Sequence, residues 1–291
     1  MNIKYLIIIP IILLACGKII LQSRISRSYL NGFTDVILYN TIVFGGMSVL
    51  YIFMNGNNLP SHVTIIYGVL YGVLKAGFQV SYTLALQRGP VSHTVLIVSF
   101  DTAFSIIFGV LYCGEVITVL QIFGLICMFM SLLLAVDFEQ VKKRVFNMAW
   151  FILSLAAMST SGTANIAMKL HKLALPQADA SLLAVSYISS TAVLFLYYLY
   201  RRAAHRQKQA LPLGLKPISM ILGVSVILGV YYILYMKGVG SIPTAVFFPV
   251  IHLGPTILIS LFSIFVLKDK VTRQQLLSLL FGIVSTLFLC L

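Results

Sequence analysis

The chain has 291 residues, of which 60% are hydrophobic and only 9% are charged, and its mean hydropathy is +1.01. Soluble domains carry roughly 25% charged residues, so this composition excludes a water-soluble fold. The net charge of +13 is compatible with nucleic-acid binding. However, the basic residues lie in connectors at the ends of apolar stretches, where they orient membrane proteins. We therefore expect an all-α integral membrane protein without a nucleic-acid partner.

Ten apolar stretches, each long enough to cross a bilayer as a helix, follow one another along the chain. We predict spans one to ten at residues 4–22, 32–54, 62–86, 90–113, 117–136, 148–170, 181–200, 216–236, 241–266 and 273–291. The longest connectors, residues 137–147 and 201–215, are basic and too short to fold alone. A single membrane domain over residues 1–291 is the simplest organisation.

The first stretch also has features of a secretory signal. Lys4 precedes an apolar run that leads to Ala15 and Cys16, so a cleaved signal peptide is one alternative. The apolar run continues to Leu21, which favours a retained span. The four cysteines lie within or at the ends of apolar stretches, and their spacing indicates neither a metal site nor a disulfide framework.

The second half of the chain repeats features of the first half. Residues 114–118 (GEVIT) follow span four, and residues 268–272 (KDKVT) follow span nine, each with a glutamine three residues later. This correspondence predicts two repeats, at about residues 1–140 and about 141–291. Since each repeat would contain five spans, the second must enter the bilayer from the opposite side. Two such inverted repeats are typical of secondary transporters.

These features resemble the EamA-type branch of the drug/metabolite transporter superfamily across essentially the whole chain. The resemblance lies in the five-plus-five spans, in an acidic residue followed by Thr after spans four and nine, and in the glycines of spans five and ten. It implies the architecture and no particular substrate. Family members carry a proline fourteen residues before the acid in both spans. Pro255 keeps that position in span nine, whereas Asp101 occupies it in span four.

Two charged residues are predicted near the middle of the membrane. Lys75 lies within span three and Asp101 within span four, where an unpaired charge costs about 2.5 to 3.5 kcal/mol on insertion scales. The turn between these spans would bring both residues to a similar depth. A structural ion pair between them is one alternative, and a role in substrate or proton handling is the other.

Polar and aromatic residues share a helical face with Lys75, because residues four apart on a helix lie on one side. Such a stripe is typical of a wet substrate cavity, and equally of interhelical packing with bonded tyrosine hydroxyls. Span six contributes a further polar face with Asn165, and Lys169 near its end is expected to anchor the helix at the membrane surface. The predicted substrate-binding residues are Lys75, Tyr71, Gln79, Tyr82 and Asn165.

Span nine carries His252, which lies one helical turn from Asp101 when the halves are registered on Glu115 and Asp269. Because histidine exchanges protons near neutral pH, we assign ion coupling to Asp101 and His252. A simple interhelical hydrogen bond is the alternative for His252.

The same span contains two internal prolines. Pro249 and Pro255 each remove an amide donor and should bend the helix at the depth of His252. We assign gating or hinge roles to both prolines and to Glu115 and Asp269, the two acids acting as helix-terminus caps.

The sequence contains no G-x-S-x-G, H-E-x-x-H or P-loop motif and no Cys and His set at metal spacing. We therefore expect no enzyme, no cofactor and no metal, with transport driven by a gradient. The predicted function is secondary active export of a small organic metabolite or drug-like solute across the cell membrane, coupled to protons or to exchange. A flippase for a lipid-linked intermediate and a membrane scaffold or sensor are the alternatives. A homodimer is compatible with the sequence.

Basic residues in the connectors are unevenly shared between the two predicted sides of the membrane. The odd-numbered connectors carry Arg24, Arg27, Arg88, Lys142, Lys143, Arg144, Arg201, Arg202, Arg206, Lys208, Lys216, Lys268, Lys270 and Arg273, and the opposite side carries Lys4, Lys169, Lys172 and Lys237. By the positive-inside rule, this distribution places both termini outside the cytoplasm. The family resemblance implies termini inside, so the orientation stays open at this point.

Overall fold

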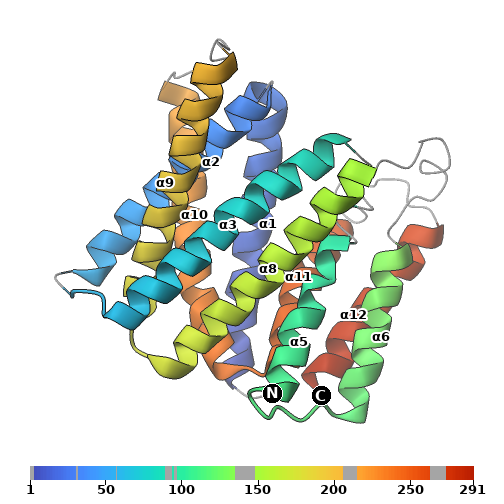
Figure 1. Cartoon of the computed structure of the whole chain (residues 1–291). Coiled ribbons are helices and arrows are strands. Elements are labelled where there is room, and N and C mark those ends of the chain that lie inside the picture. Colours follow the sequence, from blue (N-terminus) through green and yellow to red (C-terminus); the bar gives the residue numbers. More distant parts are fainter. Residues whose placement is uncertain are drawn as a thin grey trace.

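The computed structural model describes residues 3–30, 32–56, 58–88, 94, 97–134, 148–205, 215–262 and 273–291. The described part of the chain is helical and contains no strand. Its helices are η1 (Ile3–Ile7), α1 (Ile8–Tyr29), α2 (Phe33–Asn55), α3 (His62–Arg88), α5 (Asp101–Leu111), α6 (Val119–Leu134), α8 (Met148–Ala174), α9 (Asp179–His205), α10 (Leu215–Ser241), α11 (Thr244–Phe262) and α12 (Arg273–Cys290) (Figure 1).

Each predicted span overlaps one of these α-helices. Six of them, α1, α2, α3, α8, α9 and α10, are long and apolar enough to cross a membrane. The apolar parts of the other four are shorter, at Ile97–Leu111, Val119–Leu134, Thr244–Pro255 and Leu276–Cys290. The all-α membrane architecture is therefore confirmed, whereas the number of ten spans stays a prediction.

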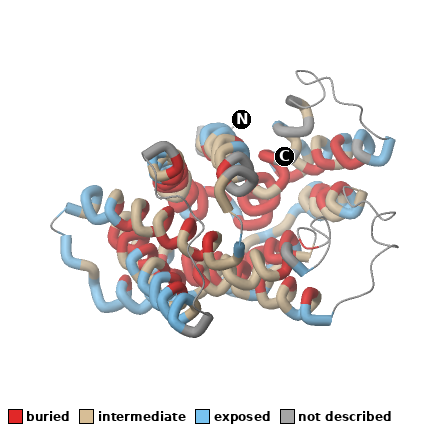
Figure 2. Tube along the Cα trace, turned by 90° about the horizontal axis from the view of Figure 1, so that it is seen from above, coloured by how far each residue is buried: buried red, intermediate tan, exposed pale blue. Residues whose placement is uncertain are grey.

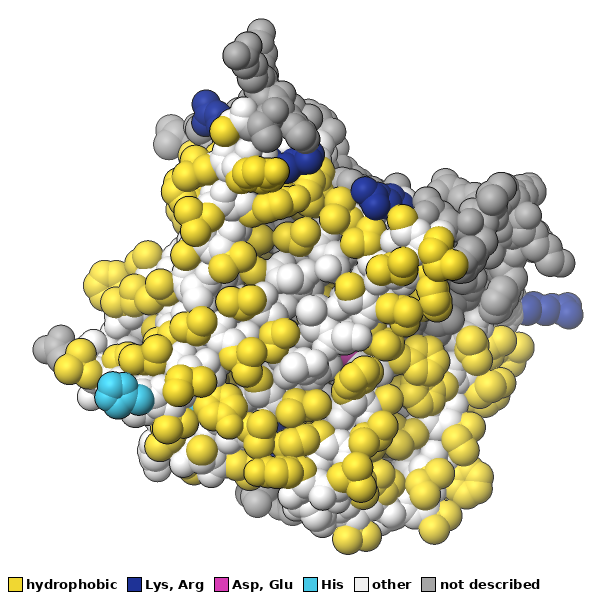
Figure 3. All heavy atoms as spheres, in the orientation of Figure 1, with side chains coloured by type: hydrophobic (Ala, Val, Ile, Leu, Met, Phe, Trp, Pro, Cys, Tyr) yellow, Lys and Arg dark blue, Asp and Glu magenta, His cyan; other side chains and the backbone are white. Residues whose placement is uncertain are grey.

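The outer surface carries the apolar side chains that a lipid environment requires. Hydrophobic side chains cover the face in Figure 3 over its whole height, and the Lys and Arg side chains that stand out lie near its upper and right edges. Buried positions gather where helices face one another (Figure 2). Leu111, Leu196 and Leu287 are examples of large residues that remain exposed. This distribution is that of a protein whose solvent is hydrocarbon.

Helices from the two halves of the chain pack against one another. The most extensive contacts join α2 to α9, α3 to α8 and α9, α1 to α10, and α6 to α12. When the helices of both halves are matched in chain order, the α3–α8 contact corresponds to α1–α10, and the α3–α9 contact corresponds to α2–α10. The α2–α9, α5–α11 and α6–α12 pairs correspond to themselves. This exchange is what a two-fold relation between halves would produce; the repeat boundaries and the inversion stay predictions.

Small residues allow the closest helix contacts, as is common between membrane helices. Ser190 of α9 donates a hydrogen bond to the Gly72 carbonyl of α3 at 2.8 Å. In the α6–α12 pair, Ser131 and Ser278 each donate to the other's carbonyl oxygen, at 2.7 and 2.8 Å. This last pair stands at one side of the bundle in Figure 1 and leaves the central positions to the other helices.

Candidate functional site

Asp101 is the most deeply buried charged residue of the candidate site, with 1% of its surface exposed. It begins α5, where the positive end of the helix dipole stabilises a carboxylate. Ser161 of α8 donates a hydrogen bond to Asp101 Oδ2 at 2.5 Å, and Thr102 Oγ1 lies 3.4 Å from Oδ1. The carboxylate is therefore held by hydroxyl groups from two helices.

His252 of α11 completes this centre. Its Nδ1 atom lies 3.9 Å from Asp101 Oδ1, an ion-pair distance when the imidazole is protonated. The histidine side chain is 29% exposed, in contrast to the buried aspartate. The structure thus brings together Asp101 and His252, and the imidazole is the more accessible of the two groups. Whether they couple an ion to transport stays a prediction.

Lys75 does not form the ion pair with Asp101 that the sequence analysis considers as one alternative. Among the described residues it forms no ion pair with Asp101; its ammonium group lies over the rings of Tyr71, Phe78 and Tyr232, 5.3, 5.9 and 5.8 Å from their centroids. Such cation–π contacts compensate only part of the lost hydration of a membrane-embedded charge. The Tyr71 hydroxyl is fully buried, and it has no hydrogen-bond partner within the described part of the chain.

A continuous set of aromatic rings extends from Lys75 toward α11. This aromatic cluster consists of Phe44, Tyr51, Tyr187, Tyr231, Tyr232, Tyr235, Phe247 and Phe248, whose ring centroids are 5.0 to 6.2 Å apart in successive contacts. Lys75 lies over the Tyr232 ring, and Tyr235 of α10 contacts Phe247 and Phe248 of α11, the helix that carries His252. The aromatic cluster therefore extends from Lys75 on α3 through α10 to α11.

The remaining predicted substrate residues occupy different surroundings. Tyr82 stacks on Phe78 with ring centroids 5.4 Å apart, so it lies one ring away from Lys75. Gln79 lines a cavity of about 10 Å³ together with residues of α2 and α9. Asn165 is buried on α8, one turn from Ser161. The structure thus groups Tyr71 and Tyr82 around Lys75, whereas Gln79 faces the α2–α9 side.

A second, partly buried charged centre lies where α5, α8, α10 and α11 end or begin near the chain termini (Figure 1). Glu115 Oε2 accepts hydrogen bonds from the Thr244 amide at 2.7 Å and from the Thr244 hydroxyl at 2.5 Å. Glu115 Oε1 lies 3.4 Å from Lys169 Nζ, which also donates to the Val239 carbonyl at 2.9 Å. These four residues form the Glu115 cluster, in which the glutamate caps α11.

Local backbone features make the Glu115 cluster compact. Gly114 has φ +65°, a conformation that glycine adopts without strain, and the Glu115 amide then donates to the Gly109 carbonyl at 3.0 Å. A methyl group at Gly109 would collide with the Thr244 hydroxyl and the Glu115 carboxylate. The connector after α5 therefore folds back on α11 through two glycines.

The structure corrects the expectation for Lys169. The sequence indicates a surface anchor, but Lys169 is 7% exposed and bonded within the Glu115 cluster. The reason is that α8 continues to Ala174, four residues beyond the predicted span, so Lys169 lies more than a turn inside the bundle. The available signal was that Lys169 shares a helical face with Ser154, Ser161 and Asn165.

The structure describes two of the other three predicted hinge residues. Pro249 and Pro255 both lie inside α11, on either side of His252. Asp269, the predicted counterpart of Glu115, lies outside the described residues.

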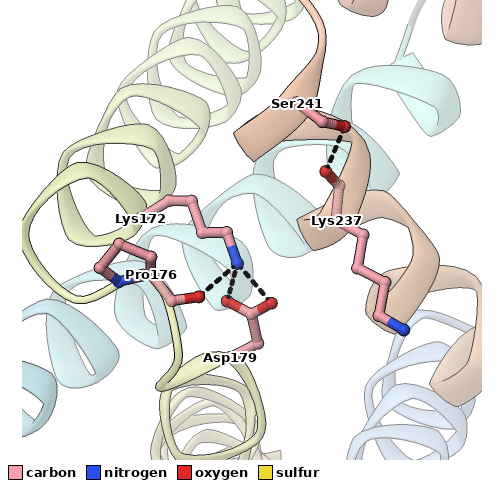
Figure 4. Close-up of polar contacts among 5 residues, drawn as sticks. All are labelled: Lys172, Pro176, Asp179, Lys237 and Ser241. Carbon is pink, nitrogen blue, oxygen red and sulfur yellow. Dashed lines mark hydrogen bonds and ion pairs between the residues drawn. The ribbon is translucent and has the colours of Figure 1, made fainter. Parts of the chain in front are cut away.

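The connector between α8 and α9 holds a further ion pair at the same end of the bundle. Lys172 Nζ lies 2.6 Å from both carboxylate oxygens of Asp179 and donates to the Pro176 carbonyl at 2.7 Å (Figure 4). The Lys237 ammonium group points away from this contact, and only its backbone carbonyl accepts a bond, from Ser241 at 2.8 Å. Lys172 is thus neutralised, whereas Lys237 is exposed.

Known proteins similar to this chain agree with its helical membrane architecture. A protein of known crystal structure superposes with a TM-score of 0.72 at 13% sequence identity, over 98% of this chain and 96% of that one, which shows a shared fold. No curated protein matches the chain. Residues 5–136, which include Lys75, Asp101 and Glu115, match the EamA-like transporter family.

Proposed function

We propose that the chain is a secondary active transporter that exports a small organic metabolite or drug-like solute across the cell membrane, with the movement coupled to protons. The family match supports a membrane transporter of this superfamily. One observation carries the proton coupling: the buried Asp101 carboxylate lies 3.9 Å from the more accessible His252 imidazole. Imidazole is the side-chain group that generally exchanges protons near neutral pH.

The location of this pair connects protonation with helix movement. Asp101 belongs to α5 and His252 to α11, and these helices come from different halves of the chain. A protonated imidazole attracts the carboxylate, whereas a neutral imidazole attracts it less. Loss of the proton therefore weakens a link between the halves, and substrate release can follow from that change.

The Glu115 cluster supplies the gate in this proposal. It joins the connector after α5 to α8, α10 and α11 at the end of the bundle that holds both termini (Figure 1). Opening a passage at that end requires the Glu115–Lys169 and Glu115–Thr244 contacts to separate. Pro249 and Pro255 lie between the capped start of α11 and its far end, so the helix can bend there.

Substrate would contact the residues around Lys75 in this proposal. Tyr71 and Tyr82 contribute ring surface beside the ammonium group, and Asn165 lies on the α8 face that also carries Ser161. Gln79 would act from the neighbouring α2–α9 side.

The proposal is tested by comparing metabolites in cells that lack the protein with those in cells that overproduce it. We expect at least one organic compound to accumulate in the medium on overproduction. Asp101→Asn should abolish that export and its dependence on external pH, because an amide keeps the shape of the carboxylate but cannot pair with a protonated His252. Asp179→Asn is the matched control and should retain export. Full pH-dependent export by the Asp101 variant would contradict proton coupling at this centre.

A further inference from the structure

We propose that the transported solute is an organic anion with a flat apolar body, and that Lys75 binds its anionic group. This inference rests on the proposed transport function and specifies its substrate class. Lys75 carries a positive charge, and the transport proposal does not identify its counter-ion.

Lys75 has no carboxylate partner among the described residues. Three of the acidic side chains there are already engaged: Asp101 with Ser161 and His252, Glu115 with Lys169, and Asp179 with Lys172. The Lys75 ammonium group instead faces three aromatic rings and remains partly exposed. A charge in this position is costly, and its retention indicates a counter-ion supplied from elsewhere.

A hydrogen-bond donor lies beside Lys75. The Lys75 ammonium group is 5.3 Å from the centroid of the Tyr71 ring, and among the described residues the buried Tyr71 hydroxyl has no hydrogen-bond partner. That hydroxyl can donate a hydrogen bond to an anion. Charge and hydrogen-bond donors both favour an anionic ligand.

The aromatic rings around Lys75 indicate the shape and polarity of the part of the ligand that is not anionic. Tyr71, Phe78 and Tyr232 surround the ammonium group, and Tyr82 extends this surface by stacking on Phe78. Aromatic faces bind flat apolar groups well and offer no donors to a bare inorganic anion. The solute therefore combines one carboxylate or phosphate-like group with a planar apolar part.

The purified full-length protein allows this to be tested by equilibrium binding. Benzoate, benzamide and benzamidinium have nearly the same shape and carry charges of −1, 0 and +1. A ligand that binds the native state raises the melting temperature, and the rise increases with the logarithm of its concentration relative to its dissociation constant. We expect benzoate to raise the melting temperature, beyond the effect of equal sodium chloride, and the other two compounds to have little effect.

Variants assign the effect to Lys75. Lys75→Gln should weaken the apparent affinity for benzoate by about tenfold to a hundredfold, the range for a lost charged hydrogen bond. Lys75→Arg keeps the charge and should retain binding, which separates loss of the site from misfolding. Lys237→Gln removes an exposed lysine of α10 and should leave the benzoate effect unchanged.

Three results would overturn the inference: stabilisation by benzamidinium in place of benzoate, no benzoate-specific stabilisation, or equal benzoate binding by Lys75→Gln. A Lys75-dependent response to short-chain phosphatidylglycerol, without one to benzoate or to phosphatidylcholine, would assign the cation to a lipid headgroup and would also overturn it. None of these results bears on whether cells export a compound, so failure here is distinguishable from failure of the transport function.

Discussion

At the scale of single residues, Asp101 and Glu115 have different physical roles. Asp101 receives a hydroxyl hydrogen bond and faces a titratable imidazole, so its surroundings change with protonation. Glu115 instead pairs with Lys169, and it bonds both polar groups of Thr244. The first acid suits proton coupling, and the second suits a contact that only movement can break.

Removal of one partner from the Glu115 cluster should be costly. Lys169→Met leaves the partly buried Glu115 carboxylate without its ion-pair partner, and we expect a loss of stability up to the range of about 3 to 5 kcal/mol that holds for fully buried pairs. The measurement is the thermal unfolding of the purified protein. Lys237→Met is the control, because Lys237 is exposed and its ammonium group points away from the neighbouring ion pair.

A double variant separates the ion pair from simple loss of packing. Adding Glu115→Gln to Lys169→Met should recover part of the lost stability, since no unpaired charge then remains buried. Unchanged stability in Lys169→Met, or strictly additive losses in the double variant, would mean that the two residues are not energetically coupled.

At the scale of helices, glycine and serine residues determine how closely two neighbouring helices pack. On α3, a methyl group at Gly72 would overlap the Ser189 hydroxyl and the Ser186 carbonyl of α9. The α3 backbone is also held at this distance from α9, because the Ser190 hydroxyl donates a hydrogen bond to the Gly72 carbonyl. The α3–α9 contact supports the helix that carries Lys75.

Gly72→Ala should therefore force α3 and α9 apart. We expect a loss of about 1 to 3 kcal/mol, typical of overpacking, together with weaker substrate binding at the displaced Lys75. Gly17→Ala on α1 is the matched control, since nothing lies within 4 Å of its added methyl group. Melting temperatures of both variants provide the comparison, and a wild-type value for Gly72→Ala would refute the close contact.

At the scale of the whole molecule, the charge at the two ends of the bundle bears on orientation. Both termini lie at the end that carries the Glu115 cluster (Figure 1). Of the lysines expected to count as free charges at that end, Lys169 and Lys172 are neutralised by Glu115 and Asp179. The positive-inside rule counts Lys and Arg whether or not an acid neutralises them, so the imbalance in favour of the opposite end stays as the sequence count gives it.

We accordingly predict that the C-terminus lies outside the cytoplasm. A C-terminal alkaline phosphatase fusion should be active in cells, and a fusion to a fluorescent protein that matures only in the cytoplasm should be dark. The reverse pattern would support the orientation that the family resemblance implies.

Hydropathy, a local property, was sufficient to locate every described α-helix. The helix ends were less predictable: the apolar run of span six stops near Leu170, whereas α8 continues to Ala174 and carries Lys169 inside the bundle. The shared register of the halves places His252 opposite a position one turn from Asp101, but the 3.9 Å approach of the two side chains depends on how α5 packs against α11. The partners of Lys75 were likewise not predictable, since they depend on how α3 and α10 are rotated toward one another.

The sequence by itself determined the lipid environment, the positions of the helices and the resemblance to a transporter family, because these follow from the order of apolar and polar residues along the chain. Only the tertiary structure decided that Lys75 faces aromatic rings, that Asp101 binds Ser161, and that Lys169 pairs with Glu115. The physical reason is that a buried charge takes its partner from whichever helix packing brings within a few ångströms, and that packing joins residues far apart in the chain.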